Sequence, residues 1–66
     1  MTENFGVYIN KTLSLDGLRL CTANLLAINI VEALSEFKNR DENICISVID
    51  MNTNRIVRTI AIPKTN

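Results

Sequence analysis

The residues of this chain that could do chemistry are few, and their spacing matches no catalytic arrangement. The 66 residues contain seven carboxylates and two cysteines but no histidine. The chain therefore lacks the side chain most used for acid–base catalysis and metal binding near neutral pH. With two glycines in all, it also lacks a glycine-rich phosphate loop. One pair of carboxylates and the two thiols remain as candidates.

Glu32 and Glu36 lie one helical turn apart in the sequence. Two such carboxylates can act as general acid and general base when burial separates their pKa values. In a helix over this segment, however, both fall on the polar side, where carboxylates are normally solvated. We therefore predict an ordinary solvated helix face rather than a catalytic pair.

Cys21 and Cys45 are separated by 23 residues and do not form a C-x-x-C motif. Two thiolates without histidine are too few for zinc, and a catalytic cysteine needs a basic neighbour. We predict that both are buried and reduced, with a disulfide as the alternative. The chain is accordingly expected to have no enzymatic activity, no cofactor and no metal.

Length and charge narrow the class of protein further. The length predicts one domain over residues 1–66, with residues 1–3 and 64–66 as flexible tails. Seven basic and seven acidic residues cancel, so no strong field draws the chain to nucleic acid or to an anionic membrane. The run LLAINIVEAL is about half the ~20 residues that a membrane span needs, and no signal peptide is visible. We expect a cytoplasmic protein that does not enter the membrane.

The elements that would position these residues begin with a strand at Asn4–Asn10 (NFGVYIN), which alternates between apolar and polar residues. Asp16-Gly17 then predicts a turn, because glycine accepts positive φ and aspartate bonds its own backbone. The segment Leu18–Cys21 fits either a short extra strand or the lead into a helix.

The central segment predicts an amphipathic helix that begins at a Thr22 or Asn24 N-cap and ends near residues 38–39. Its apolar face would comprise Leu26, Ala27, Ile30, Val31, Ala33, Leu34 and Phe37. Leu25 and Ile28 fall on the opposite, polar side. Two apolar residues three positions apart form a small exposed patch there, which suggests a second contact.

The C-terminal segment Ile44–Ile62 (ICISVIDMNTNRIVRTIAI) predicts a β-hairpin whose turn lies within Asp50–Arg55. Asn54 is the residue expected to adopt the left-handed conformation. The stretch SVIDMNTNRIVRTIAI, from Ser47 to Ile62, resembles the strand–turn–strand unit of YVTN-type β-propeller repeats. A propeller repeats this unit about every 40 residues and this chain contains it once, so the resemblance implies a hairpin and no function.

The register of this hairpin decides which side chains lie on its solvent-exposed face. If Asp50 pairs with Arg55, Val48 lies opposite Val57 and Ile46 opposite Thr59, whereas a slip of one residue would exchange the two faces. In either register both faces are largely apolar, and a single helix covers only one of them. A second copy of the chain is the expected cover, either on the sheet face or edge to edge, with a target protein as the alternative.

We therefore expect an α+β fold, in which one helix packs on one face of a three-stranded antiparallel sheet in the order β-α-β-β. The expected core residues are Phe5, Val7, Ile9, Leu26, Ile30, Leu34, Phe37, Ile46 and Val48. A core of this size supplies little stability, which also favours a homodimer.

The function expected from these features is that of a small non-enzymatic interaction module. It would act as a regulator or inhibitor by binding a larger protein, a class that phages and mobile elements often encode. The candidate contact residues are Tyr8, Leu25, Ile28, Met51, Asn52, Arg55 and Arg58. The alternative is a dimeric nucleic-acid-binding protein that inserts the hairpin around Arg55 and Arg58 into a major groove.

Overall fold

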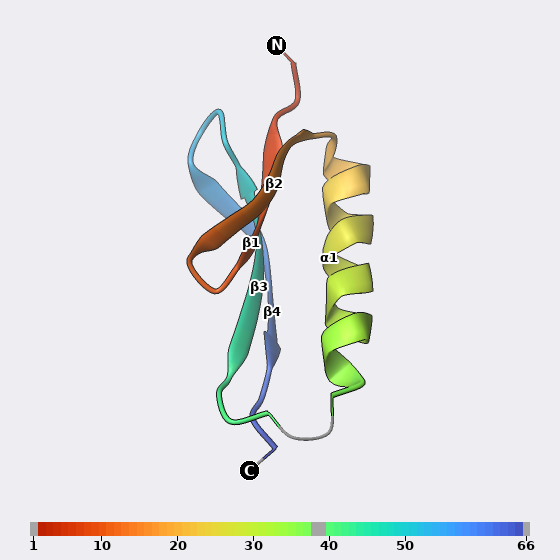
Figure 1. Ribbon diagram of the computed structural model, residues 1–66. Coiled ribbons are helices and arrows are strands. Elements are labelled where there is room, and N and C mark those ends of the chain that lie inside the picture. Colours follow the sequence, from red (N-terminus) through yellow and green to blue (C-terminus); the bar gives the residue numbers. More distant parts are fainter. Residues whose placement is uncertain (1, 38–39, 66) are drawn as a thin grey trace.

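The computed structural model describes residues 2–37 and 40–65, which form one helix and one sheet. The elements, within these ranges, are β1 (Phe5–Ile9), β2 (Thr12–Leu18), α1 (Leu20–Ser35), β3 (Ile44–Asp50) and β4 (Arg55–Ile62). The sheet has the order β2-β1-β3-β4, and every neighbouring pair is antiparallel. The helix stands against one face of the sheet, and the turns of both hairpins bend away from it (Figure 1).

The expected three-stranded sheet in β-α-β-β order is wrong, because the described chain forms a second hairpin before the helix. The chain reverses at Asn10-Lys11, where Asn10 has a φ of 57° and Ile9 lies opposite Thr12. Asparagine tolerates this left-handed conformation better than other residues with a Cβ. The segment Leu18–Cys21 is not a strand of its own, since β2 ends and the helix begins within it.

Asp16-Gly17 lies inside β2 and forms an irregularity there instead of a turn. The pairing of β2 with β1 shifts register between Phe5 and Val7, and Gly17 has a φ of 71°. The N–H of Gly17 donates to Asn4 Oδ1 at 2.9 Å. Positive φ within a strand is typical of a bulge built on glycine. The residues that predicted a turn therefore bend a strand that the sequence did not predict, β2.

The helix begins earlier than either expected cap, so Thr22 and Asn24 are wrong as N-caps. The N-cap position is Arg19, whose side chain makes no capping bond. Instead, Glu3 Oε2 accepts the N–H of Leu20 at 3.0 Å, from 17 residues earlier in the chain. A carboxylate at this place satisfies an unpaired N–H and opposes the positive end of the helix dipole. The described helix ends at Ser35, and residues 38–39, where its end was expected, lie outside the described residues.

The core lies between α1 and the central strands β1 and β3. Its buried hydrophobic residues are Phe5, Val7, Ala23, Ala27, Ile46, Val48 and Ile62. Around them pack the partly buried side chains of Ile9, Leu18, Leu26, Ile30, Val31, Leu34, Ile44 and Ile60. Phe37 was expected in the core but is 63% exposed. The reason is that the helix ends two residues before it, so the helical periodicity no longer applies.

The β3–β4 hairpin confirms its expected turn and corrects its register. Asp50 lies opposite Arg55, and Asn54 has a φ of 61°. A register shift between Val48 and Ile49 then places one extra residue in β4, so the pairs Val48–Val57 and Ile46–Thr59, which follow from an unbroken register, are not formed. The observed pairs are Val48 with Arg58, Ile46 with Ile60, and Ile44 with Ile62. Because sides alternate along a strand, the bulge turns Ile60 and Ile62 toward the helix.

Candidate interaction surface

The described residues expose several large apolar side chains, and these fall in separate places on the fold. They are Leu13, Leu15, Leu20, Leu25, Ile28, Phe37, Ile56 and Val57. Three of them belong to the helix, of which Leu25 and Ile28 lie on its side away from the sheet, and two lie at the start of β4. Scattered apolar residues are normal on a surface, so their grouping is what carries information.

The first group is a strip on the outer side of α1, formed by Cys21, Leu25 and Ile28 and called here the helix strip. Leu25 is 59% exposed and Ile28 38% exposed. The spacing i, i+4, i+7 places the three residues on one side of the helix, opposite the buried Ala23 and Ala27. The helix thus has an apolar side in the core and a second, narrower one in solvent.

The two thiols are both free in this structure. Cys21 is exposed, so its expected burial is wrong, while Cys45 is partly buried with its Sγ 3.8 Å from Ser47 Oγ. Cys21 has its Sγ 4.0 Å from Thr22 Oγ1. Both sulfur contacts lie within single elements and leave Cys21 as part of the helix strip.

The face of the sheet turned away from α1, the outer face, is mixed rather than wholly apolar. Across its middle runs a row of Tyr8, Ser47 and Thr59, all of which carry hydroxyl groups. A second row, of Gly6, Ile49 and Ile56, lies toward the β3–β4 turn. The bulge in β4 causes this separation, because it removes Ile60 and Ile62 from the outer face. The continuous apolar face expected from the unbulged register is therefore not formed.

Gly6 marks a close approach of side chains on the outer face. A Cβ at this position would lie 3.0 Å from Met51 Sδ and 3.3 Å from Leu13 Cδ1. These distances are shorter than ordinary van der Waals contact, so the two side chains cover the backbone where a larger residue would project. Met51 is half-buried in this small cluster and is less available for contact than expected.

The remaining candidate residues occupy different surfaces. Arg55 and Arg58 are exposed on β4, with Asp50 opposite Arg55. Asn52 in the turn donates its Nδ2 to the Thr2 carbonyl at 2.9 Å, and its N–H to Asp50 Oδ1 at 3.0 Å. Asn52 therefore ties the N-terminal segment to the turn. Leu25 and Ile28 share one side of α1, Arg55 and Arg58 lie on either side of the bulge in β4, and half-buried Tyr8 lies on the outer face of the sheet.

The exposed start of β4, at Ile56 and Val57, was missed by sequence reasoning. Ile56 is 64% and Val57 49% exposed. Both belong to an Ile- and Val-rich run that predicts a buried strand, and only the bulge and the bend of the hairpin away from α1 expose them. No signal in the sequence alone distinguishes them from Ile60 and Ile62.

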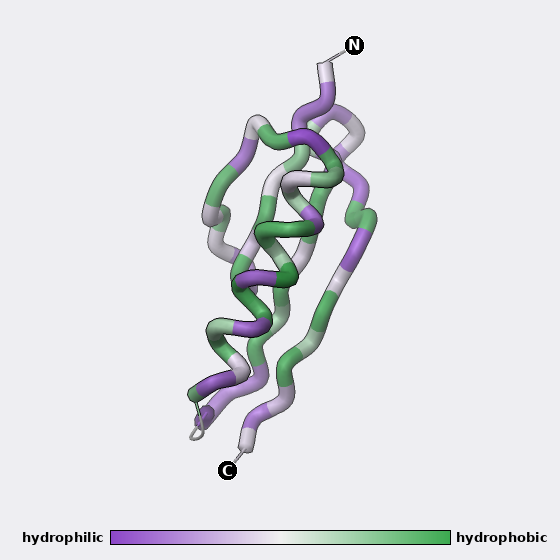
Figure 2. The backbone as a smooth tube through the Cα atoms, turned by 90° about the vertical axis from the view of Figure 1, so that its right-hand side faces the viewer, coloured by the Kyte–Doolittle hydropathy of each residue, from purple (hydrophilic) through white to green (hydrophobic). Residues whose placement is uncertain are grey.

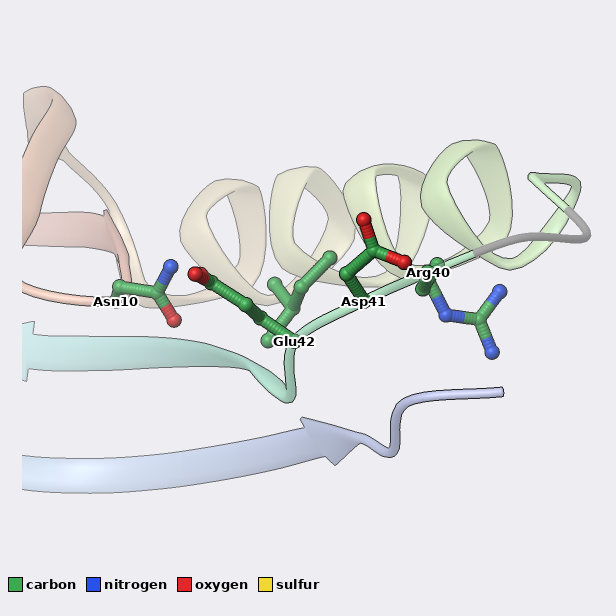
Figure 3. Close-up of a pocket in the computed structure, with 5 residues that line it drawn as sticks. Asn10, Arg40, Asp41 and Glu42 are labelled. Carbon is green, nitrogen blue, oxygen red and sulfur yellow. The ribbon is translucent and has the colours of Figure 1, made fainter. Parts of the chain in front are cut away.

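A hollow of about 390 Å³ lies between the β1–β2 turn, the segment that joins α1 to β3, and the start of β3, and it is lined by Asn10, Arg40, Asp41, Glu42 and Ile44. Figure 3 shows the Glu42 carboxylate extended toward Asn10, while the Arg40 guanidinium is turned away from it. That guanidinium donates from Nη1 to the Phe37 carbonyl at 2.6 Å, and from Nη2 to the Pro63 carbonyl at 3.2 Å. Arg40 thus joins the segment after α1 to the segment after β4, and its role here is structural.

Neither a metal site nor a membrane span is found in the described part of the chain. In residues 2–37 and 40–65, no three acidic, cysteine or histidine side chains are placed to hold a metal ion together. The helix of the described residues is too short to cross a bilayer. Comparisons of the chain with protein-family models, with curated proteins and with solved structures found no match.

Proposed function

We propose that this chain is a non-enzymatic interaction module of the cytoplasm that regulates or inhibits a larger protein by binding it. The observation that carries the proposal is the helix strip of Cys21, Leu25 and Ile28. A surface helix needs one apolar side to pack on its own sheet, and α1 already has that side in the core. A second apolar strip in solvent does not contribute to the stability of the isolated chain. It favours contact with the surface of another molecule.

The spacing of the strip fits one mode of recognition. Helices that dock into an apolar groove place their anchors at i, i+3 or i+4, and i+7. Cys21, Leu25 and Ile28 occupy i, i+4 and i+7, and the exposed Glu32 follows one turn later on the same side. The partner surface that fits is therefore an apolar groove with a basic group at one end.

A capture experiment from the native host tests this proposal. We expect the intact tagged protein to recover one larger protein in stoichiometric amount, and the variant Leu25→Ser/Ile28→Ser to recover at least about tenfold less. Both side chains are exposed, so the far-UV circular dichroism and the urea midpoint of this variant should match those of the unmodified chain.

The matched control is Phe37→Ser, which removes an exposed apolar side chain outside the strip. This variant should recover the larger protein as well as the unmodified chain does. Equal recovery by the strip variant would contradict the proposal. Recovery of RNA or DNA in place of protein, with a salt-dependent shift of a labelled duplex, would favour the alternative, a ribbon that binds nucleic acid through Arg55 and Arg58.

A further inference from the structure

The two open edges of the sheet differ in their capacity to accept another strand. β2 has two register shifts against β1 and contains Gly17 at positive φ. Bulges of this kind twist an edge and prevent regular pairing. β4 has one shift, near its start, and then runs in regular register from Arg58 to Ile62 along β3. Figure 2 shows β4 running along the side of the molecule, beside the helix rather than beneath it.

The backbone groups that β4 presents at this edge follow from the ladder on the other side of β3. The N–H of Asn10 donates to the Cys45 carbonyl at 2.7 Å, and the Cys45 N–H donates to Asn10 Oδ1 at 3.0 Å. The backbone of Cys45 is therefore directed at β1. Because successive residues of an antiparallel strand alternate in this direction, Ile44 and Ile46 are directed at β4.

The same alternation applies to their partners in β4. Ile60 and Ile62 lie opposite Ile46 and Ile44, so their N–H and C=O groups are directed at β3. The N–H and C=O groups of Thr59 and Ala61, between and beside them, are directed at the open edge. Both residues are exposed, and their side chains are small. The edge thus offers two donors and two acceptors in strand geometry.

We propose that two copies of this chain pair through β4 in antiparallel orientation, about a two-fold axis at Ile60, to form one continuous eight-stranded sheet. In this register Thr59 exchanges backbone hydrogen bonds with Ala61 of the partner subunit, and Ala61 does so with Thr59 of the partner subunit. The two N–H and two C=O groups that each copy directs at the open edge are therefore all paired. Arg58 lies opposite Ile62 of the partner subunit, which keeps like charges apart. An axis at Arg58 would place two arginines opposite each other, and an axis at Thr59 would need the bulged Val57.

A second copy fits this edge better than an unrelated strand because the pairing is self-complementary and closes. The two-fold uses β4 of both copies, and the edges left open are the two irregular β2 strands. Assembly therefore stops at two chains, with both helices on the same face of the shared sheet. The helix strip takes no part, so this inference is independent of the proposed function.

The test compares two substitutions at one position by analytical ultracentrifugation. The unmodified chain should sediment with twice its 7.4 kDa mass at about 500 µM, since an interface this small is at the weak end of specific contacts. Ala61→Pro removes only an N–H directed away from β3, which edge strands tolerate. We expect it to remain folded and to raise the dimer dissociation constant about 100-fold, because each subunit loses one donor. Ala61→Val keeps the N–H and should remain dimeric.

Amide hydrogen exchange gives a second readout that needs no variant. The amides of Thr59 and Ala61 should be protected at high concentration and should lose that protection on dilution, while the Ile60 amide remains protected at both. A monomer at about 500 µM, a folded Ala61→Pro variant that still dimerises, or unprotected Thr59 and Ala61 amides would each overturn the proposal. Growth beyond two chains would also overturn it, since it would indicate pairing of β4 with β2. Leu25→Ser/Ile28→Ser should leave the dimer intact, so the two proposals can fail separately.

Discussion

Single side chains in this protein connect segments that are distant in the sequence. Glu3 accepts the first N–H of α1, and Asn4 Oδ1 accepts the N–H of Gly17 in β2. Two consecutive residues before β1 thereby hold both the helix start and the bulge. Neither bond could be expected from local sequence, because helix caps are sought within a few residues of the helix and these acceptors lie 17 and 13 residues away.

We predict that Glu3→Ala lowers the free energy of unfolding by about 0.5–1 kcal/mol, because the N–H of Leu20 loses its acceptor and the helix dipole loses a counter-charge. Glu3→Gln keeps an acceptor oxygen and should lose less. Urea unfolding followed by circular dichroism at 222 nm measures both. The control is Glu32→Gln, which changes the net charge by the same amount on an exposed part of the helix. Equal urea midpoints for Glu3→Ala and the unmodified chain would show that the Glu3 carboxylate does not stabilise the start of the helix.

At the scale of elements, bulges shape both edge strands: one bends β2 at Gly17, and the other decides which side of β4 packs on the core. The sequence predicted the first strand, the helix and the last hairpin, with Asn54 at positive φ, because these depend on local alternation and turn chemistry. It did not predict β2, since Asp16-Gly17 is the stronger turn signal and Asn10-Lys11 the weaker one. The sequence also did not predict the bulge at Val57. That bulge follows from packing Ile60 and Ile62 against the core on the helix side of the sheet, which is a property of the whole fold.

We predict that Gly17→Ala destabilises the chain by about 1–2 kcal/mol, because a residue with a Cβ is strained at a φ of 71°. Space is not the cause, since an added Cβ would have no neighbour within 4 Å. Gly17→Asn should cost less than Gly17→Ala, because asparagine tolerates the left-handed region. Thermal unfolding of the three proteins gives the ranking, and an alanine variant as stable as the glycine one would show that β2 does not need the bulge.

At the scale of the whole molecule, Arg40 connects two chain segments at the end of the fold opposite the start of the helix. Arg40 bonds the Phe37 carbonyl and the Pro63 carbonyl. Its own backbone exchanges hydrogen bonds with Thr65, at 2.9 Å and 3.0 Å. The chain after the helix and the chain after β4 are thus held together at one point. The helix strip lies away from this junction, whereas Ala61 of the β4 edge is two residues before Pro63. The sequence identified Leu25 and Ile28 and allowed pairing edge to edge, but it did not identify the strand that would pair.

We predict that Arg40→Ala lowers the free energy of unfolding by about 1–3 kcal/mol, since it leaves carbonyl groups at the helix end without their charged donor. Arg40→Lys keeps the charge but cannot reach both carbonyls with a planar group, so it should recover only part of the loss. Chemical denaturation measures both, and full recovery by lysine would mean that charge alone accounts for the effect.

The chain is much longer than it is wide, with extents of 44 × 17 × 15 Å. A rod of these proportions experiences more hydrodynamic drag than a sphere of equal mass, and it also tumbles more slowly about its short axes. On a gel-filtration column calibrated with spherical standards, a lone molecule would therefore elute somewhat early, at an apparent mass above its own. Rotational correlation times would be biased in the same direction, so a shape-independent mass is the direct way to distinguish one chain from two.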